Sequence, residues 1–175
     1  GLVGSEMCIR DRINAEPALF PSATAAPIGS QASSPDEKFE GLVLLADDTP
    51  ANRLVIERLL CRLGVRIAEV ADGQQAVDAI RSGMKPDLVL MDLQMPIMDG
   101  LEATRSIRQW ETAHGGARLP IIALTAAAFD TDRERCLSAG MDGYLTKPIR
   151  MGNLKSTLRD WLPIRVRADT AAPAQ

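Results

Sequence analysis

A chain of 175 residues with 46% hydrophobic and 25% charged residues has the composition of a single globular domain with additional segments. Its net charge of −3 and isoelectric point near 5.2 argue against a nucleic-acid-binding surface, which is normally basic. No apolar run approaches the roughly 20 residues of a membrane-spanning helix, and three scattered cysteines, too few for a disulfide framework or a metal cluster, indicate reduced thiols in a cytoplasmic protein.

Both ends of the chain are predicted to lie outside the folded domain. Residues 1–12 show no periodicity and no signal-peptide layout, and their back-translated sequence resembles a library adapter, so we interpret them as an artefact. Residues 13–39 combine four prolines with Ala, Ser and Thr, which is typical of a flexible linker to a missing upstream region. Residues 164–175 are rich in Ala and Pro and are predicted to form a disordered tail. The folded domain is therefore expected at 40–163.

Five apolar runs alternate with five helical patterns inside these limits. The runs are predicted to be strands at residues 42–46, 65–70, 87–91, 120–124 and 142–145. The helices are expected at residues 50–63, 73–82, 100–112, 130–139 and 151–162. This regular alternation predicts an α/β fold, a doubly wound, five-stranded parallel sheet with five helices.

The helical patterns also predict which side chains are buried. Val55 is expected on the inward face of the first helix. Trp110 and Trp161 are interpreted as helix-packing residues, and Cys61 as a small packing residue. His114, which stands beside two glycines, is predicted to lie in a loop.

Charged and hydroxyl side chains stand at the ends of four of the predicted strands. Asp47 and Asp48 follow the first strand, and Asp92 follows the third. Thr125 ends the fourth strand, and Lys147 follows the fifth. Because the carboxyl ends of parallel strands meet at one edge of a sheet, we expect these side chains to share a cleft. Each residue alone has an ordinary explanation as a turn, capping or surface residue, but their conjunction favours a functional site.

This combination of residues predicts phosphoryl-transfer chemistry. Three carboxylates in one cleft repel each other, and a hard divalent cation such as Mg²⁺ would keep all of them ionised. Lys147 offers a compact positive charge for a phosphoryl oxygen, and Thr125 offers a hydrogen bond. An aspartate nucleophile, a metal ion and a lysine together meet the requirements of phosphoryl transfer.

Four motifs at these positions give the chain its resemblance to a known family. They read LLADD at 44–48, MDLQMPIMDG at 91–100, ALTA at 123–126 and Lys147-Pro148. Over residues 40–162 the chain resembles the receiver domain of two-component response regulators. The form of the second motif is most similar to receivers of hybrid sensor histidine kinases. The resemblance implies a flavodoxin-like sheet with the strand order 2-1-3-4-5.

The resemblance also implies a role for each acidic residue. Asp92 would be the phosphoacceptor, taking a phosphoryl group from the phosphohistidine of a histidine kinase or a phosphotransfer domain. Asp48 and Asp92 would bind Mg²⁺ directly, with the backbone carbonyl of Gln94 as a further ligand. Asp47 would act on the metal mainly through water.

A conformational switch is implied in the same way. Lys147 would bind the phosphoryl group, and its bond to Pro148 is expected to be cis. Thr125 would move inward to hydrogen-bond the acyl phosphate beside the small Ala126, and Tyr144 would follow as the aromatic switch residue. The face formed by the fourth helix, the fifth strand and the fifth helix would then change its affinity for a downstream partner.

Wider interpretations concern the whole protein. We expect a cytoplasmic fragment of a hybrid sensor kinase, which a missing sensor region tethers to the inner membrane, and a stand-alone response regulator is the alternative. The domain itself is not expected to be a stand-alone enzyme or to contact nucleic acid or membrane, and receivers occur both as monomers and as homodimers. An aspartate-nucleophile phosphatase is disfavoured because it needs a second carboxylate two residues after Asp92, where this chain has Gln94.

Overall fold

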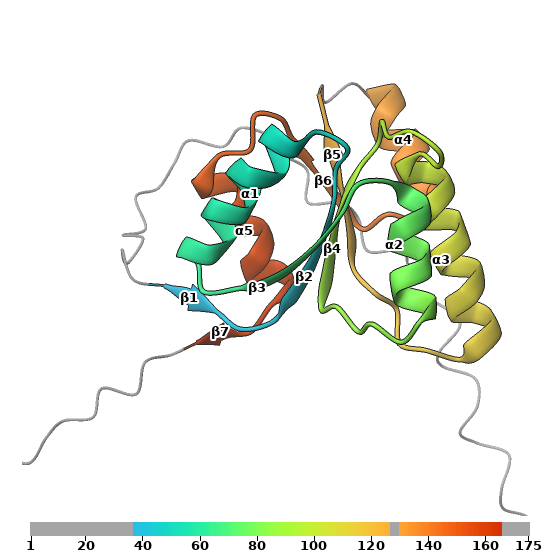
Figure 1. The fold of residues 1–175 in the computed structure, drawn as a ribbon, viewed down its shortest axis with the longest axis horizontal. Coiled ribbons are helices and arrows are strands. Elements are labelled where there is room, and N and C mark those ends of the chain that lie inside the picture. The colour runs from blue at the N-terminus through green and yellow to red at the C-terminus, as the bar shows by residue number, and fades with distance from the viewer. Residues whose placement is uncertain (1–36, 127–129, 166–175) are drawn as a thin grey trace, which may run out of the picture. The chain divides into compact units, whose positions relative to one another are not determined.

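Five parallel strands form the central sheet of the protein. A computed structural model of the protein describes residues 37–126 and 130–165. The strands lie in the order β3-β2-β4-β5-β6 (Figure 1), and they are β2 (Leu42–Ala46), β3 (Arg66–Val70), β4 (Leu88–Asp92), β5 (Ile121–Thr125) and β6 (Gly143–Thr146). Counted in chain order among these five, this is the order 2-1-3-4-5, which confirms the predicted topology.

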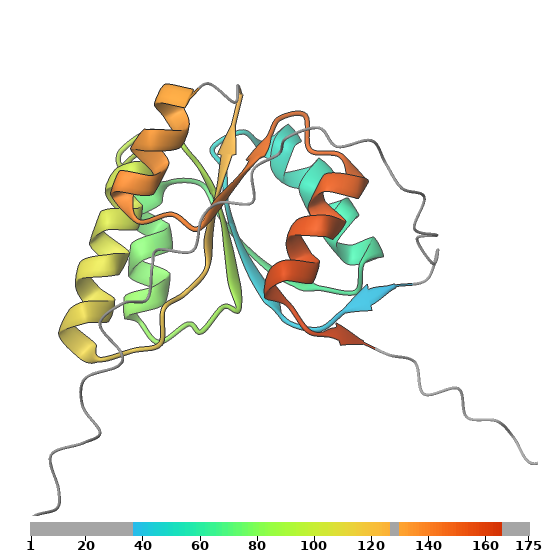
Figure 2. The same ribbon diagram turned by 180° about the vertical axis from the view of Figure 1, so that it is seen from behind.

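Helices cover both faces of this sheet. On one face lie α1 (Pro50–Arg62) and α5 (Met151–Trp161), and on the other lie α2 (Gly73–Arg81), α3 (Gly100–His114) and α4 (Asp130–Ala139) (Figure 1 and Figure 2). β2, β4 and β5 are buried along almost their whole length. Strands covered on both faces need continuous apolar runs, which is the pattern that these segments carry. Among the described residues, no helix has both the length and the apolar character needed to cross a membrane.

Short connections at the carboxyl ends of the strands place the polar residues. Pro50 is the first residue of α1, which begins where the sequence predicts. The Thr49 side chain before it does not cap the helix, and its Oγ1 instead donates to Asp48 Oδ1 at 3.1 Å. Asp72 and Asp99 do cap α2 and α3, and each carboxylate accepts a hydrogen bond of 2.8 Å from the backbone N–H three residues later. These caps fix the direction in which each loop enters its helix.

A second, two-stranded sheet joins the two ends of the domain. β1 (Lys38–Phe39) pairs antiparallel with β7 (Ile164–Arg165). The structure differs here from the sequence prediction, which assigns residues 38–39 to the linker and 164–165 to the tail. Residues 1–36 and 166–175 lie outside the described residues, so the rest of both predictions is not tested. Phe39 explains the difference, because its side chain is 1% exposed and packs in the core between the sheet, α1 and α5.

Ion pairs hold the same segment against α5. The Glu37 carboxylate accepts a hydrogen bond of 2.9 Å from Arg159 Nε and lies 2.8 Å from Lys155 Nζ. The hydrogen bond from Arg159, together with the one from Lys155, lowers the pKa of Glu37 from 4.5 to about 2. The segment before β2 is therefore bound to the last helix by charge as well as by the burial of Phe39.

Glu37→Gln is expected to destabilise the domain slightly at neutral pH and to have no effect in strong acid. Because the pKa of Glu37 in the folded state lies below 4.5, its carboxylate stabilises the fold above this pH, and the contribution disappears as the pH falls toward about 2. Urea unfolding midpoints of wild type and variant, measured across this range, should therefore converge on acidification. Glu40→Gln, which alters an exposed carboxylate of the same segment, is the matched control. A difference that stays constant with pH would contradict the prediction.

Some side chains lie elsewhere than the helical patterns predict. Val55 is 53% exposed and Trp161 is 38% exposed, so neither is a core residue, and Cys61 is also exposed. His114 is the last residue of α3 rather than a loop residue, and its ring stacks on Trp110 with the ring centroids 4.7 Å apart. Trp110 packs against the core, which confirms its predicted role.

Candidate functional site

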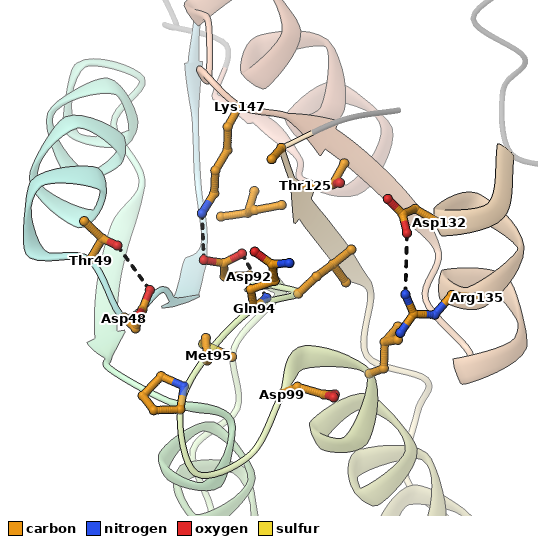
Figure 3. Close-up of a pocket in the computed structure, with 15 residues that line it drawn as sticks. Asp48, Thr49, Asp92, Gln94, Met95, Asp99, Thr125, Asp132, Arg135 and Lys147 are labelled. Carbon is orange, nitrogen blue, oxygen red and sulfur yellow. Dashed lines mark hydrogen bonds and ion pairs between the residues drawn. The ribbon is translucent and has the colours of Figure 1, made fainter. Parts of the chain in front are cut away.

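The carboxyl ends of β2, β4 and β6 bring two aspartates and a lysine together. Ala46 lies beside Met91 in the β2–β4 ladder, so Asp47 and Asp92, which come next, leave neighbouring strands side by side. Lys147 follows β6, and because β5 lies between β6 and β4, a long side chain is needed to reach across. Lys147 Nζ donates to Asp92 Oδ2 at 2.7 Å (Figure 3) and to Asp47 Oδ2 at 2.8 Å.

Two of the three acidic residues are buried and the third is exposed. Asp47 has no exposed surface and Asp92 is buried, whereas Asp48 is exposed. One carboxylate oxygen from each of the three residues lies within 4.8 Å of the other two. The carboxylates outnumber the lysine that contacts them, so the cluster attracts cations and is open to solvent at Asp48.

Burial and ion pairing act in opposite directions on the charges of this cluster. Burial raises the pKa of Asp92 above its ordinary value, although the hydrogen bond from Lys147 acts the other way. Burial by itself would lower the pKa of Lys147, but its hydrogen bonds to Asp47 and Asp92 outweigh that effect and raise the pKa. Lys147 is therefore a firm cation, while the ionised form of Asp92 is held at some cost in stability.

The loop after Asp92 is tightly built. The backbone N–H of Gln94 donates to Asp92 Oδ1 at 3.3 Å. Ile97 has a φ of 70°, which is strained for a β-branched residue, and its side chain is exposed. A Cβ added to Gly100 would lie 2.1 Å from the backbone oxygen of Asp92. Only glycine therefore allows α3 to begin this close to Asp92.

A cavity of about 760 Å³ opens at this edge of the sheet. Two of the predicted site residues that the structure describes, Asp47 and Tyr144, do not line this cavity. Tyr144 instead packs against the core on the side of α2, α3 and α4. The Lys147–Pro148 peptide bond is cis, as expected. Most of the predicted site residues do line the cavity (Figure 3), namely Asp48, Asp92, Gln94, Thr125, Ala126 and Lys147.

Further residues at the site were not singled out by the sequence. Asp132 and Arg135 on α4 line the same cavity and form an ion pair with a distance of 3.6 Å. Asn52 and Arg53, in the first turn of α1, donate hydrogen bonds to Asp47. None of these residues ends a strand, so the strand-end argument does not find them. One feature of the sequence could have pointed to Asn52: it is a poor helix former in the first turn of a helix that begins close to an acidic pair.

The fold defines a flavodoxin-like α/β protein of the receiver type. Residues 43–159 match the model of the response regulator receiver domain. The chain therefore belongs to the response regulator receiver domain family, and it is a receiver of the two-component phosphorelay class. The motifs at the strand ends predicted this family, and the comparison confirms it.

Individual relatives show where such domains occur. The sensor histidine kinase GacS of Pseudomonas protegens is 45% identical over 126 residues, which are 71% of this chain and 14% of GacS. The receiver domain of the sensor histidine kinase PA1611 from Pseudomonas aeruginosa, whose crystal structure has a magnesium ion coordinated in the active site cleft, is 46% identical. That match has a TM-score of 0.61 and covers 71% of this chain and 97% of that one.

A third match comes from a complex. A chain in the co-crystal structure of the Saccharomyces cerevisiae histidine phosphotransfer protein Ypd1 with the receiver domain of Ssk1 is 30% identical, with a TM-score of 0.65. It covers 71% of this chain and 89% of that one. The 126 residues that match GacS are only a small part of that kinase, so this chain spans a small part of its relative's length. The predicted similarity to the receiver regions of hybrid sensor histidine kinases is confirmed.

Proposed function

We propose that Asp92 is the phosphoacceptor, which receives a phosphoryl group from the phosphohistidine of a histidine kinase or a phosphotransfer protein. The observation that carries this proposal is the position of its carboxylate. Asp92 lines a cavity large enough for a phosphoryl group, beside a lysine cation and two further carboxylates. Membership of the family supports the class of reaction, and this geometry supports Asp92 as the residue that accepts the phosphoryl group.

The acidic cluster fits Mg²⁺. Carboxylate and carbonyl oxygens are the ligands this ion prefers, and it keeps several waters that a phosphate can replace. Asp48, Asp92 and the backbone carbonyl of Gln94 are proposed as direct ligands. Asp47 is proposed to act through water, because it is fully buried and already paired with Lys147. When bound, the ion neutralises charge on the phosphoryl oxygens during transfer.

The chain's own residues account for the rest of the transfer. A carboxylate oxygen of Asp92 forms a bond to phosphorus as the bond from phosphorus to the donor's histidine nitrogen breaks, and its electron pair returns to the imidazole. Lys147 remains protonated, and its ammonium group contacts a negatively charged phosphoryl oxygen once the group is on Asp92. The Thr125 hydroxyl donates to another oxygen, and the methyl side chain of Ala126 leaves room for the group.

Phosphorylation of Asp92 is proposed to change the conformation of the surface formed by α4, β6 and α5. A phosphoryl group adds about −1.5 to −2 charge at the end of β4, next to Lys147 and Thr125. Movement of Thr125 toward the phosphate frees space into which Tyr144 on β6 would turn. The face formed by α4, β6 and α5 would then change its affinity for a downstream protein, whose identity the domain itself does not specify.

The relatives support a setting for this switch. We infer a receiver that belongs to a hybrid sensor histidine kinase in the cytoplasm, where a sensor region would tether it to the inner membrane, and a stand-alone response regulator is the alternative. In either case the kinase activity would belong to other domains, and the receiver would assist its own phosphorylation without being a separate enzyme. A phosphatase is disfavoured because Gln94 stands where a second carboxylate would be needed.

Labelling with acetyl phosphate tests the proposal. The wild-type protein is incubated with acetyl phosphate in Mg²⁺ or in EDTA, and its intact mass is measured. A gain of one phosphoryl group in Mg²⁺, strongly reduced in EDTA and located on the peptide that contains Asp92, is the expected result. Equal labelling in both buffers would contradict the proposed requirement for Mg²⁺. A label on another residue would contradict the proposal that Asp92 is the phosphoacceptor.

A further inference from the structure

The buried Asp47 carboxylate is held by the first turn of α1 as well as by Lys147. Its Oδ1 accepts a hydrogen bond of 2.9 Å from the backbone N–H of Thr49, and its Oδ2 accepts one of 2.8 Å from Lys147. Asn52 Nδ2 lies between the two oxygens, 3.3 Å from Oδ1 and 3.4 Å from Oδ2. Asn52 is therefore the one of these three donors that contacts both carboxylate oxygens.

The backbone of Asp47 is fixed separately. Arg53 donates from its guanidinium to the Asp47 carbonyl oxygen at 2.6 Å, and the same group forms an ion pair of 3.5 Å with Glu69 on β3. Arg53 thus holds the main chain at the end of β2, whereas Asn52 contacts the carboxylate itself, as Thr49 and Lys147 do. The two functions lie on adjacent residues and can be separated by substitution.

The contacts of Asn52 and Lys147 with Asp47 also differ in whether phosphorylation of Asp92 would disturb them. Lys147 divides its charge between Asp47 and Asp92, and a phosphoryl group on Asp92 would compete for it. Among the residues that the structure describes, the side-chain amide of Asn52 donates to Asp47 alone. Loss of a donor to a buried carboxylate is unfavourable, so a side-chain donor that Asp47 does not share with Asp92 has a clear physical purpose.

From these contacts we propose that Asn52 is a positioning residue for the metal site. It fixes the orientation of the Asp47 carboxylate, and through Asp47 it sets the affinity of the acidic cluster for Mg²⁺. The inference rests on the proposed metal site.

Calorimetric titration of the unphosphorylated protein with Mg²⁺ tests the inference. Asn52→Ala should weaken Mg²⁺ binding about fivefold, which is the loss expected when a long hydrogen bond to a charged group is removed. Asn153→Ala is a matched control, because Asn153 is exposed and is the third residue of α5 as Asn52 is of α1. Its affinity should equal that of the wild type.

Two further measurements separate positioning from folding. Asn52→Gln keeps the amide and should recover most of the lost affinity. In EDTA, Asn52→Ala should unfold within about 3 °C of the wild type, because alanine favours the helix and offsets part of the lost hydrogen bond. All titrations are made where circular dichroism shows every variant folded.

The outcomes distinguish this inference from the proposed metal site. If the wild-type protein binds no Mg²⁺, the proposed metal site is wrong, and so is the inference that rests on it. Wild-type binding that Asn52→Ala leaves unchanged would overturn the inference alone. Equal losses in Asn52→Ala and Asn153→Ala, or no recovery in Asn52→Gln, would also overturn it.

Discussion

Asp92→Asn protein is expected to acquire no phosphoryl group from acetyl phosphate in Mg²⁺ under conditions that label the wild type. An amide offers no charged oxygen to attack phosphorus, so the nucleophile is lost. Asparagine has nearly the same shape as aspartate, and it can still accept the hydrogen bond that Lys147 donates. Loss of label in a folded variant would therefore reflect the chemistry of this one carboxylate.

The same variant is expected to unfold about 2–4 °C above the wild type in EDTA. Burial raises the pKa of Asp92, so the folded protein holds the ionised side chain less favourably than the unfolded chain does. This cost is present above the raised pKa and disappears as the pH falls through it, so the difference should be largest near neutral pH. Mg²⁺ should also narrow the difference, because the wild type has one more carboxylate to bind the ion.

Asp160→Asn provides the control for both measurements. Asp160 is an exposed carboxylate on α5, and its substitution should change neither the label nor the unfolding temperature. Labelling of Asp92→Asn at the wild-type level would place the acceptor elsewhere. A lower unfolding temperature than that of the wild type would mean that the ion pair with Lys147 outweighs the burial of Asp92.

The sheet could be predicted because its central strands are buried on both faces. Leu88 to Asp92 and Ile121 to Thr125 are buried throughout, and only a continuous apolar run satisfies such an environment. A run of this kind is visible without any knowledge of its neighbours. The polar residue that ends each run is then visible as well, which is why Asp92 and Thr125 were found.

Contacts between distant segments had no such signal. Glu37 and Arg159 are separated by 122 residues, and nothing near Glu37 in the sequence predicts its partner. The Pro- and Ser-rich composition before Phe39 indicates a linker, and a single aromatic side chain is too little to reverse that prediction. The β1–β7 pairing therefore follows from tertiary contacts alone.

Local ambiguity limited the prediction of α1. Leu54, Val55 and Ile56 are three consecutive apolar residues, and a helix can turn only part of such a run toward the core. Ile56 is buried, while Leu54 and Val55 are exposed. Asn52 was missed for a related reason, because its function depends on the position of Asp47 and not on the pattern of the helix that carries it.

Lys147→Met is expected to lower the free energy of unfolding by about 3 kcal/mol in EDTA. Methionine keeps much of the apolar stem but removes the cation that both Asp47 and Asp92 contact. Asp47 has no exposed surface, so it cannot regain water unless the structure opens around it. Removing one partner from a buried ion pair leaves an uncompensated charge, which is among the most destabilising of single substitutions.

Mg²⁺ is expected to restore part of this loss, because a divalent cation at the acidic cluster can replace some of the lysine's charge. Urea unfolding of wild type and variant, each in EDTA and in saturating Mg²⁺, measures both the loss and the recovery. Lys85→Met removes an exposed lysine and should stay within about 0.5 kcal/mol of the wild type in either buffer. Equal losses in the two variants would mean that Lys147 does not hold the carboxylates. A loss that Mg²⁺ leaves unchanged would assign the effect to packing of the lysine stem, since a charge effect must respond to the second cation.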